Sequence, residues 1–215
     1  MDYVDHYFYT GTDIQKEKIV KKKIAFFDFD GTITTKDTLL EFIKFSKGEF
    51  KFFTGFLLNS PYIVGYKLNI ISNQRAKEKV LQFFFKNTAV EVFENKCVLF
   101  YKNALSKLIK SKALIEIERL KQNGVDVVIV SASPENWIKH WAQKMQVQLL
   151  ASKLEVKDGK ITGKILGKNC YGNEKVRRIK EVYDLSKYSV VAAYGDTKGD
   201  KQMLAMAEKG YYKRF

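Results

Sequence analysis

The chain has 215 residues, of which 46% are hydrophobic and 14% aromatic. This composition supports a packed core, excludes a wholly disordered or fibrous chain, and suits one domain or one domain with an insertion. Lysine and arginine number 38 against 24 acidic residues, so the formal charge is +14 and the surface must be strongly basic. Cys97 and Cys170 are too few for a disulfide framework or a zinc ribbon. We interpret them as buried thiols of a protein in a reducing compartment, the cytoplasm.

The first structural element is expected just after a lysine-rich segment. Residues 1–22 lack a hydrophobic period and are expected to form an N-terminal extension, with no apolar region or cleavage site typical of a signal peptide. The apolar run 24–27 stops abruptly at Asp28 and predicts a buried strand that opens into a polar loop. The same pattern recurs at 125–130 and at 189–194. These segments predict three strands whose carboxyl ends carry polar residues.

Helical patterns alternate with these strands. Residues 112–122 have an apolar face and stop at Asn123-Gly124, a typical helix end, and another helix is expected to begin at Pro134. The alternation predicts an α/β fold with a doubly wound parallel sheet. Residues 37–108 show helical spacing and no convincing strand, so we expect a helical insertion there. The core would then consist of residues 23–36 and 109–215, roughly 120 residues.

The loop after the first strand contains two closely spaced carboxylates. Asp28 and Asp30 flank a single residue, and Gly31 allows a sharp turn before the hydroxyl of Thr32. Carboxylates this close repel each other and favour a bound cation, for which Mg²⁺ with its oxygen ligands is well suited. Acidic residues after the last strand would complete the site, so the candidate metal ligands are Asp28, Asp30, Asp196 and Asp200. Alternatively, Asp30-Gly31 forms a hairpin turn and the later acids cap a helix.

The order of the polar motifs resembles that of a known superfamily. Residues 28–32, then Ser131, then Lys175, then Gly195-Asp196 with Asp200, resemble the four motifs of the haloacid dehalogenase superfamily, across residues 23–208. The helical insertion after the first motif is similar to that of the phosphoserine phosphatase branch, and histidinol phosphate phosphatases are also similar. The resemblance implies a Rossmann-like core with a helical cap. It also implies a Mg²⁺-dependent phosphomonoester hydrolase that forms an aspartyl-phosphate.

The resemblance further implies roles for individual residues. Asp28 matches the nucleophile and Asp30 the general acid and base. Thr32, Ser131 and Lys175 are expected to hold the phosphoryl group, although the segment around Lys175 also suits a solvated helix face. Asp196 matches the acidic metal ligand, and Asp200 the acid that steadies metal-bound water or the lysine. Asp37 occupies the position at which phosphoserine phosphatases have a substrate-binding glutamate.

The substrate and partners remain open at this stage. Residues 52–66 are aromatic, almost free of charge and too short to span a bilayer, and they resemble the apolar cap of phosphatidylglycerophosphatase C. With Lys44, Lys47, Lys51 and Lys67 nearby, they suggest peripheral contact with an anionic membrane and a lipid phosphate substrate. The alternatives are a helical cap core and a small-molecule phosphate ester. A nucleic-acid partner is disfavoured because the lysines are spread along the chain. The sequence predicts no oligomeric state.

Overall fold

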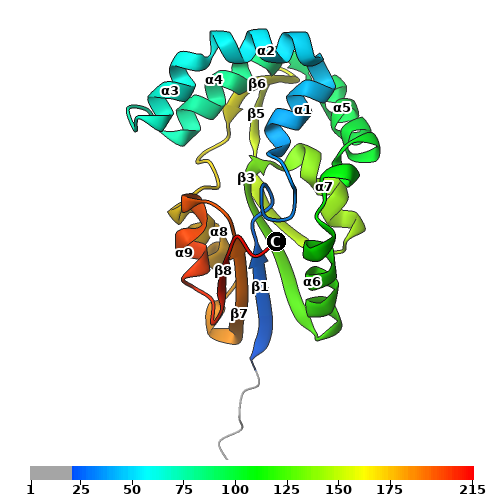
Figure 1. Ribbon diagram of the computed structural model, residues 1–215, viewed down its shortest axis with the longest axis vertical. Helices are drawn as coiled ribbons and strands as arrows, with labels where there is room; N and C mark the ends of the chain where they lie inside the picture. Colours follow the sequence, from blue (N-terminus) through cyan, green and yellow to red (C-terminus); the bar gives the residue numbers. More distant parts are fainter. Residues whose placement is uncertain (1–20) are drawn as a thin grey trace, which may run out of the picture.

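A computed structural model describes residues 21–215, and Figure 1 shows how their elements are arranged. The central sheet has five strands in the order β4-β3-β1-β7-β8, and every neighbouring pair is parallel. Its strands are β1 (Lys22–Phe27), β3 (Val125–Pro134), β4 (Gln148–Ser152), β7 (Tyr188–Gly195) and β8 (Gly210–Tyr212). This arrangement confirms the predicted doubly wound α/β fold. The expected extension lies outside the described residues up to residue 20, and Lys22 already belongs to β1.

The register of the sheet brings three strand ends to one edge. Phe27, the last residue of β1, pairs with Ile129 of β3 and with Tyr194 of β7. The backbone N–H of Asp28 donates to the carbonyl of Tyr194 at 2.9 Å, which extends this alignment into the following loop. Because parallel strands end at the same edge, the polar residues that follow them in the sequence become neighbours in space.

Helices cover both faces of the central sheet. They are α6 (Ser111–Gln122) and α7 (Glu135–Lys144) on one face and α8 (Asn173–Val182) and α9 (Lys201–Leu204) on the other. Side chains of β1 alternate between these layers: Phe27 belongs to the same buried cluster as Ile117 of α6, and Phe26 packs with Ile179 of α8. All four side chains are completely buried, as expected for a strand at the centre of a parallel sheet.

Residues 38–103, which follow β1 and precede α6, form a cap over the carboxyl edge of the sheet (Figure 1). Its helices are α1 (Thr38–Lys47), α2 (Glu49–Leu58), α3 (Ser60–Lys67), α4 (Asn73–Phe85) and α5 (Val90–Asn103). The short 3₁₀ turn η1 (Leu105–Leu108) follows α5. Two further 3₁₀ turns lie in the core on either side of β7: η2 (Leu185–Lys187) and η3 (Lys198–Asp200). Phe42 of α1 stacks on Trp137 of α7 with ring centroids 4.7 Å apart, and it also meets Phe85 and Phe100. This aromatic cluster joins the cap to the core.

A small antiparallel sheet completes the cap. It consists of β2 (Thr88–Ala89), β6 (Lys160–Ile165) and β5 (Leu154–Lys157), in that spatial order. Asp158 and Gly159 both have positive φ and form the turn between β5 and β6. The sequence-based boundaries assign this hairpin to the core, yet its strand β6 pairs with β2 within residues 37–108, where no strand was expected. A two-residue strand is too short to show an alternating pattern.

The end of β3 also differs from the prediction. The strand continues past Val130 to Pro134, because Ser131 and Pro134 pair with Ala151 and Ser152 of β4 across an irregularity. Pro134 therefore precedes α7 and does not begin it. Within residues 21–215, no helix has the length and apolar character that crossing a membrane requires.

Candidate active site

Three acidic residues meet at the carboxyl edge of the central sheet. Carboxylate oxygens of Asp28, Asp196 and Asp200 lie within 4.8 Å of one another, although the first follows β1 and the others follow β7. Asp28 and Asp200 are buried and Asp196 is partly buried. Three buried or half-buried carboxylates in this space repel one another unless positive charge is present.

Lys175 supplies positive charge from the first turn of α8. Its Nζ donates to Oδ1 of Asp28 at 2.5 Å, to Oδ1 of Asp200 at 2.6 Å and to the carbonyl of Val130 at 2.7 Å. The side chain is almost completely buried, so this lysine belongs to the interior and not to a solvated helix face. Three acceptors use all three of its N–H donors, which fixes the ammonium between the first and last motifs.

The side chain of Asp30 lies apart from this acidic group. Its Oδ1 accepts hydrogen bonds from the backbone N–H and the hydroxyl of Thr38, both at 2.6 Å, and its Oδ2 accepts from the hydroxyl of Ser133 at 2.6 Å. Trp137 in turn donates from Nε1 to the Thr38 hydroxyl at 3.0 Å. The first turn of α1 captures this carboxylate because its N–H groups have no partners within the helix. The Asp30 side chain is therefore held for a task other than joining the three-carboxylate group.

The residues between and after these acids shape the loop. Gly31 has a φ of +72°, and a Cβ at this position would lie 2.1 Å from Oδ2 of Asp196. Glycine is therefore required both by the backbone conformation and by the approach of the carboxylate. The buried hydroxyl of Thr32 donates to Oδ1 of Asp196 at 3.4 Å, a long contact that directs Thr32 toward the acidic group. Asp200 accepts at Oδ2 from the N–H and the hydroxyl of Thr197, at 2.9 and 2.8 Å.

Ser131 and Asp37 each have a local structural contact. Ser131 is completely buried, and its Oγ accepts a hydrogen bond from the N–H of Ser133 at 3.0 Å. Asp37 caps the N-terminus of α1, where its Oδ1 accepts from the N–H groups of Leu39 and Leu40. The same carboxylate lines the pocket described below. Asp37 can therefore both cap α1 and contact a ligand in the pocket.

The charges in this site depend strongly on one another. Burial raises the pKa of Asp28 to about 8 against the opposing effect of Lys175, and burial together with Asp200 raises the pKa of Asp196. Burial would lower the pKa of Lys175, but Asp28 and Asp200 raise it above its usual value and keep the ammonium charged. Burial would raise the pKa of Asp200, yet the ammonium and the hydrogen bonds from Thr197 hold it below its usual value.

This donor set fits a hard divalent cation. Asp28, Asp196 and Asp200 bring carboxylate oxygens to one point. When all three carboxylates are ionised, the single positive charge of the Lys175 ammonium does not balance their negative charge. Oxygen-rich sites with one or two carboxylates are typical of Mg²⁺. Burial and neighbouring carboxylates raise the pKa values of Asp28 and Asp196, and a cation bound between them would favour their ionised forms. We therefore assign these three residues as those able to hold Mg²⁺.

A pocket of about 270 Å³ opens beside the acidic group. Its core side includes Asp28, Asp30 and Lys175, and its cap side includes Asp37 and Lys77. Sequence reasoning missed Lys77, which extends from α4 and donates to the carbonyl of Ala132 at 3.0 Å. Burial lowers its pKa, against the attraction of Asp37. In a chain with 38 basic residues, nothing in the local sequence distinguishes this lysine. Thr38 and Ser133 were also missed, although each lies close in sequence to a predicted site residue.

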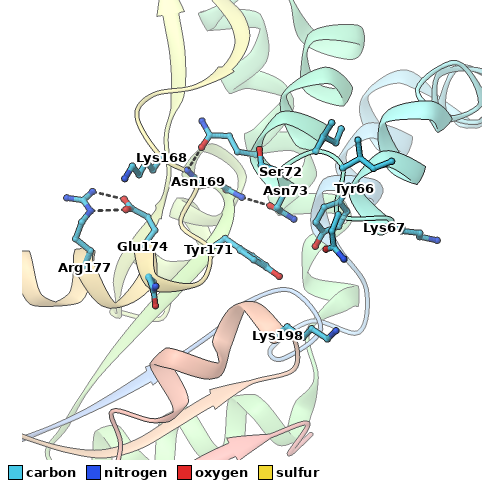
Figure 2. Close-up of a pocket in the computed structure, with 15 residues that line it drawn as sticks. Tyr66, Lys67, Ser72, Asn73, Lys168, Asn169, Tyr171, Glu174, Arg177 and Lys198 are labelled. Atoms are coloured by element: carbon cyan, nitrogen blue, oxygen red, sulfur yellow. Dashed lines mark hydrogen bonds and ion pairs between the residues drawn. The ribbon is translucent and has the colours of Figure 1, made fainter.

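A wider cleft of about 1020 Å³ lies outside this pocket, and Figure 2 shows the side chains that line it. Tyr66, Asn73 and Tyr171 line both spaces, so the cleft adjoins the pocket. Hydrogen bonds from Asn169 to Asn73 and Gln74 join the cap to the core along one wall. Burial and the neighbouring Tyr66 hydroxyl raise the pKa of the Tyr171 phenol to about 12. The cleft therefore places polar side chains directly outside the carboxylate pocket.

Comparisons with known proteins identify the family. The family model for haloacid dehalogenase-like hydrolases matches residues 25–205. Protein CicA of Caulobacter vibrioides is 35% identical over 190 residues, which cover 86% of this chain and 83% of that protein. A solved protein of unknown function from Bordetella pertussis Tohama I has a TM-score of 0.75 at 18% identity, with 86% of each chain covered. A phosphoserine phosphatase solved as a phospho-aspartyl intermediate analogue has a TM-score of 0.59 at 23% identity, covering 87% of this chain and 84% of its own. The chain belongs to the haloacid dehalogenase-like hydrolases.

Proposed function

We propose that this hydrolase is a Mg²⁺-dependent phosphatase that cleaves phosphate monoesters through a phosphorylated Asp28. The observation that carries the proposal is the Lys175 ammonium, which bridges Asp28 and Asp200 beside Asp196 and faces the pocket. The fold shared with a phosphoserine phosphatase that was captured as a phospho-aspartyl analogue supports it. The free, buried thiols of Cys97 and Cys170 support our further proposal that the protein works in the reducing cytoplasm.

Each side chain has a task in this mechanism. Lys175 holds Oδ1 of Asp28, so attack on phosphorus falls to the other carboxylate oxygen, and the P–O bond to the alcohol breaks as the new P–O bond forms. Asp30, oriented by Thr38 and Ser133, gives a proton to the departing alcohol oxygen. It then takes a proton from the water that hydrolyses the phosphorylated Asp28. Mg²⁺ held by the acidic group would neutralise charge that otherwise repels the phosphate.

The pocket suits a small or amphipathic phosphate ester. Its volume of about 270 Å³ admits a phosphoryl group with a short alcohol, and the adjoining outer cleft offers space for a longer one. Lys77 and Asp37 lie on the cap side, opposite the carboxylates of the core, and can pair with charged or polar groups of the alcohol. The buried ammonium of Lys77 also attracts the anionic ester toward Asp28. A membrane-lipid phosphate is the alternative substrate that fits the wider cleft.

Hydrolysis assays with Mg²⁺ test this function. Phosphoserine, histidinol phosphate and phosphatidylglycerophosphate form a suitable panel, with EDTA added in parallel reactions. We expect wild-type protein to release phosphate from at least one ester, and Asp28→Asn to abolish this release. Asp126→Asn is the matched control, since that carboxylate is exposed on β3. Undiminished turnover by Asp28→Asn, or equal turnover in EDTA, would contradict the proposed mechanism.

A further inference from the structure

An exposed apolar stripe runs along the outer side of α2 and α3. Its members are spaced by three and four residues and are all exposed: Phe50, Phe53, Leu57, Pro61, Val64 and Leu68. The largest exposed fractions are 82% for Phe50 and 73% for Leu57. Spacing of this kind places side chains on one face of a helix. We call these six residues the cap stripe.

The stripe continues from one helix to the next. Asn59 alone separates α2 from α3, and its buried side chain donates from Nδ2 to the carbonyl of Gly55 at 2.8 Å. The opposite side of α2 packs on the cap: a Cβ at Gly55 would collide with Phe84, and the rings of Phe56 and Phe84 have centroids 5.9 Å apart. The cap thus has its own aromatic core, and the stripe is additional apolar surface that no described residue covers.

The charge along the stripe is predominantly positive. Residues 50–77 contain no aspartate or glutamate and include Lys51, Lys67 and Arg75, all exposed, while the exposed Glu49 lies at the start of α2, beside Phe50. Lys79 of α4 lies over the ring of Tyr62 on α3, with Nζ 5.3 Å from its centroid. An apolar strip with basic residues along it is complementary to an anionic lipid surface. A second copy of this chain fits less well, because a symmetric contact would bring two positive edges together.

The stripe also leads to the active-site entrance. Leu68 ends it, and the next residues, from Asn69 to Gln74, line the outer cleft. Ile70 is 74% exposed and belongs to that lining. Figure 1 shows α2 and α3 along the outer edge of the cap, and Figure 2 shows the cleft beside Tyr66 and Lys67. A surface that covers the stripe therefore lies next to the mouth of the cleft.

We propose that the cap stripe docks this protein on the surface of an anionic phospholipid bilayer, with the mouth of the outer cleft beside the lipid headgroups. Phe50, Phe53 and Leu57 would enter the boundary between headgroups and acyl chains, while the lysines remain at the level of the phosphates. This docking uses only surface residues and does not require the proposed hydrolysis to be correct.

Vesicle flotation tests the docking. Purified protein is mixed with vesicles of phosphatidylcholine and phosphatidylglycerol, or of phosphatidylcholine alone, at low and high salt. We expect wild-type protein to float with the anionic vesicles, with less bound at high salt or on neutral vesicles. Phe53→Ser combined with Leu57→Ser should reduce binding by more than about tenfold, since two large side chains no longer enter the bilayer. Lys51→Glu should reduce it by at least about fivefold.

Matched variants keep the result interpretable. Ile115→Ser removes an equally exposed apolar side chain from α6, and Lys112→Glu reverses an exposed charge on the same helix; both should bind as wild type does. Asp28→Asn should also float normally, which separates docking from catalysis. Every stripe variant should keep the wild-type melting temperature and its turnover of a soluble ester. Absence of flotation, or equal binding by the double variant, would overturn the proposal. A wild-type dimer that the double variant dissociates, without vesicle binding, would instead identify the stripe as a subunit interface.

Discussion

Replacing Lys175 by methionine removes the charge that holds the acidic group together while keeping most of the apolar stem. The ammonium makes three hydrogen bonds, to Asp28, Asp200 and the Val130 carbonyl, and the residue is only 1% exposed. Removing one partner from a buried ion pair typically costs about 3 to 5 kcal/mol. At roughly 2 to 4 °C per kcal/mol for a protein of this size, we expect Lys175→Met to melt about 10 °C below the wild type.

The stability that Lys175→Met loses relative to wild type should grow as the pH rises. Burial already raises the pKa of Asp28 from 3.8 to about 8, and Lys175 opposes that shift, so its removal raises this folded-state pKa further. When the pKa of a carboxyl group is higher in the folded than in the unfolded state, the free energy of unfolding falls as the pH rises from the unfolded-state pKa to the folded-state pKa. The variant should therefore lie closer to wild type at about pH 6 than at about pH 9, because Asp28 of the wild type ionises beside Lys175 above about pH 8 whereas Asp28 of the variant stays protonated.

Circular dichroism melts in EDTA at these two pH values provide the measurement. Lys180→Met serves as control, because Lys180 is exposed on the same helix and should change the melting temperature little. Phosphatase turnover of Lys175→Met should fall by at least about 100-fold, in line with the loss of a charged group that orients the nucleophile. If the variant melted within about 2 °C of wild type at both pH values, our interpretation of the site's electrostatics would be refuted.

Three further changes probe the loop and the cap. Gly31→Ala should displace Asp196 and weaken Mg²⁺ activation by about 10- to 100-fold in a titration of turnover against Mg²⁺; an unchanged activation curve would contradict this. Lys77→Met should raise KM by about tenfold, which corresponds to roughly 1.4 kcal/mol of binding free energy, with a smaller change in kcat. A change in kcat alone would contradict a role of Lys77 in substrate binding. Burial and Asp30 raise the pKa of Asp37 to about 6, so wild-type stability should fall as the pH rises from about 4 through 6. Asp37→Asn should flatten that part of a melting-temperature profile, and parallel profiles would show that Asp37 is not the group responsible.

The core was predictable because each strand carries its own signal. An apolar run that ends at Asp28, and another that ends at Gly195-Asp196, indicate buried strands with polar carboxyl ends, and parallel pairing then brings these ends together. The turn at Asp158-Gly159 is equally local in origin, since this dipeptide favours the positive φ values that the turn requires. In these places local sequence and tertiary structure agree.

The cap was less predictable because its contacts connect distant segments. Lys77 enters the pocket only because α4 packs against β6 in the cap, and no local pattern separates this lysine from the others. Thr38 reaches Asp30 because α1 begins at that residue, a boundary that sequence patterns locate poorly. The segment 52–66 was ambiguous for a similar reason: Phe52 and Phe53 are adjacent and equally apolar, yet only the first is buried. Which side of α2 faces outward depends on α4.

The central claim is that Asp28 becomes covalently phosphorylated. An ester labelled in its phosphate group, mixed with wild-type protein and Mg²⁺ and quenched in acid, allows the labelled residue to be mapped by proteolysis and mass spectrometry. We predict one labelled carboxylate, at Asp28, that hydroxylamine releases and that Asp28→Asn lacks. Slower breakdown of the label in Asp30→Asn would fit the proton-transfer role of that residue. Hydrolysis that proceeds with no label on the protein, or with the label on another residue, would contradict the account.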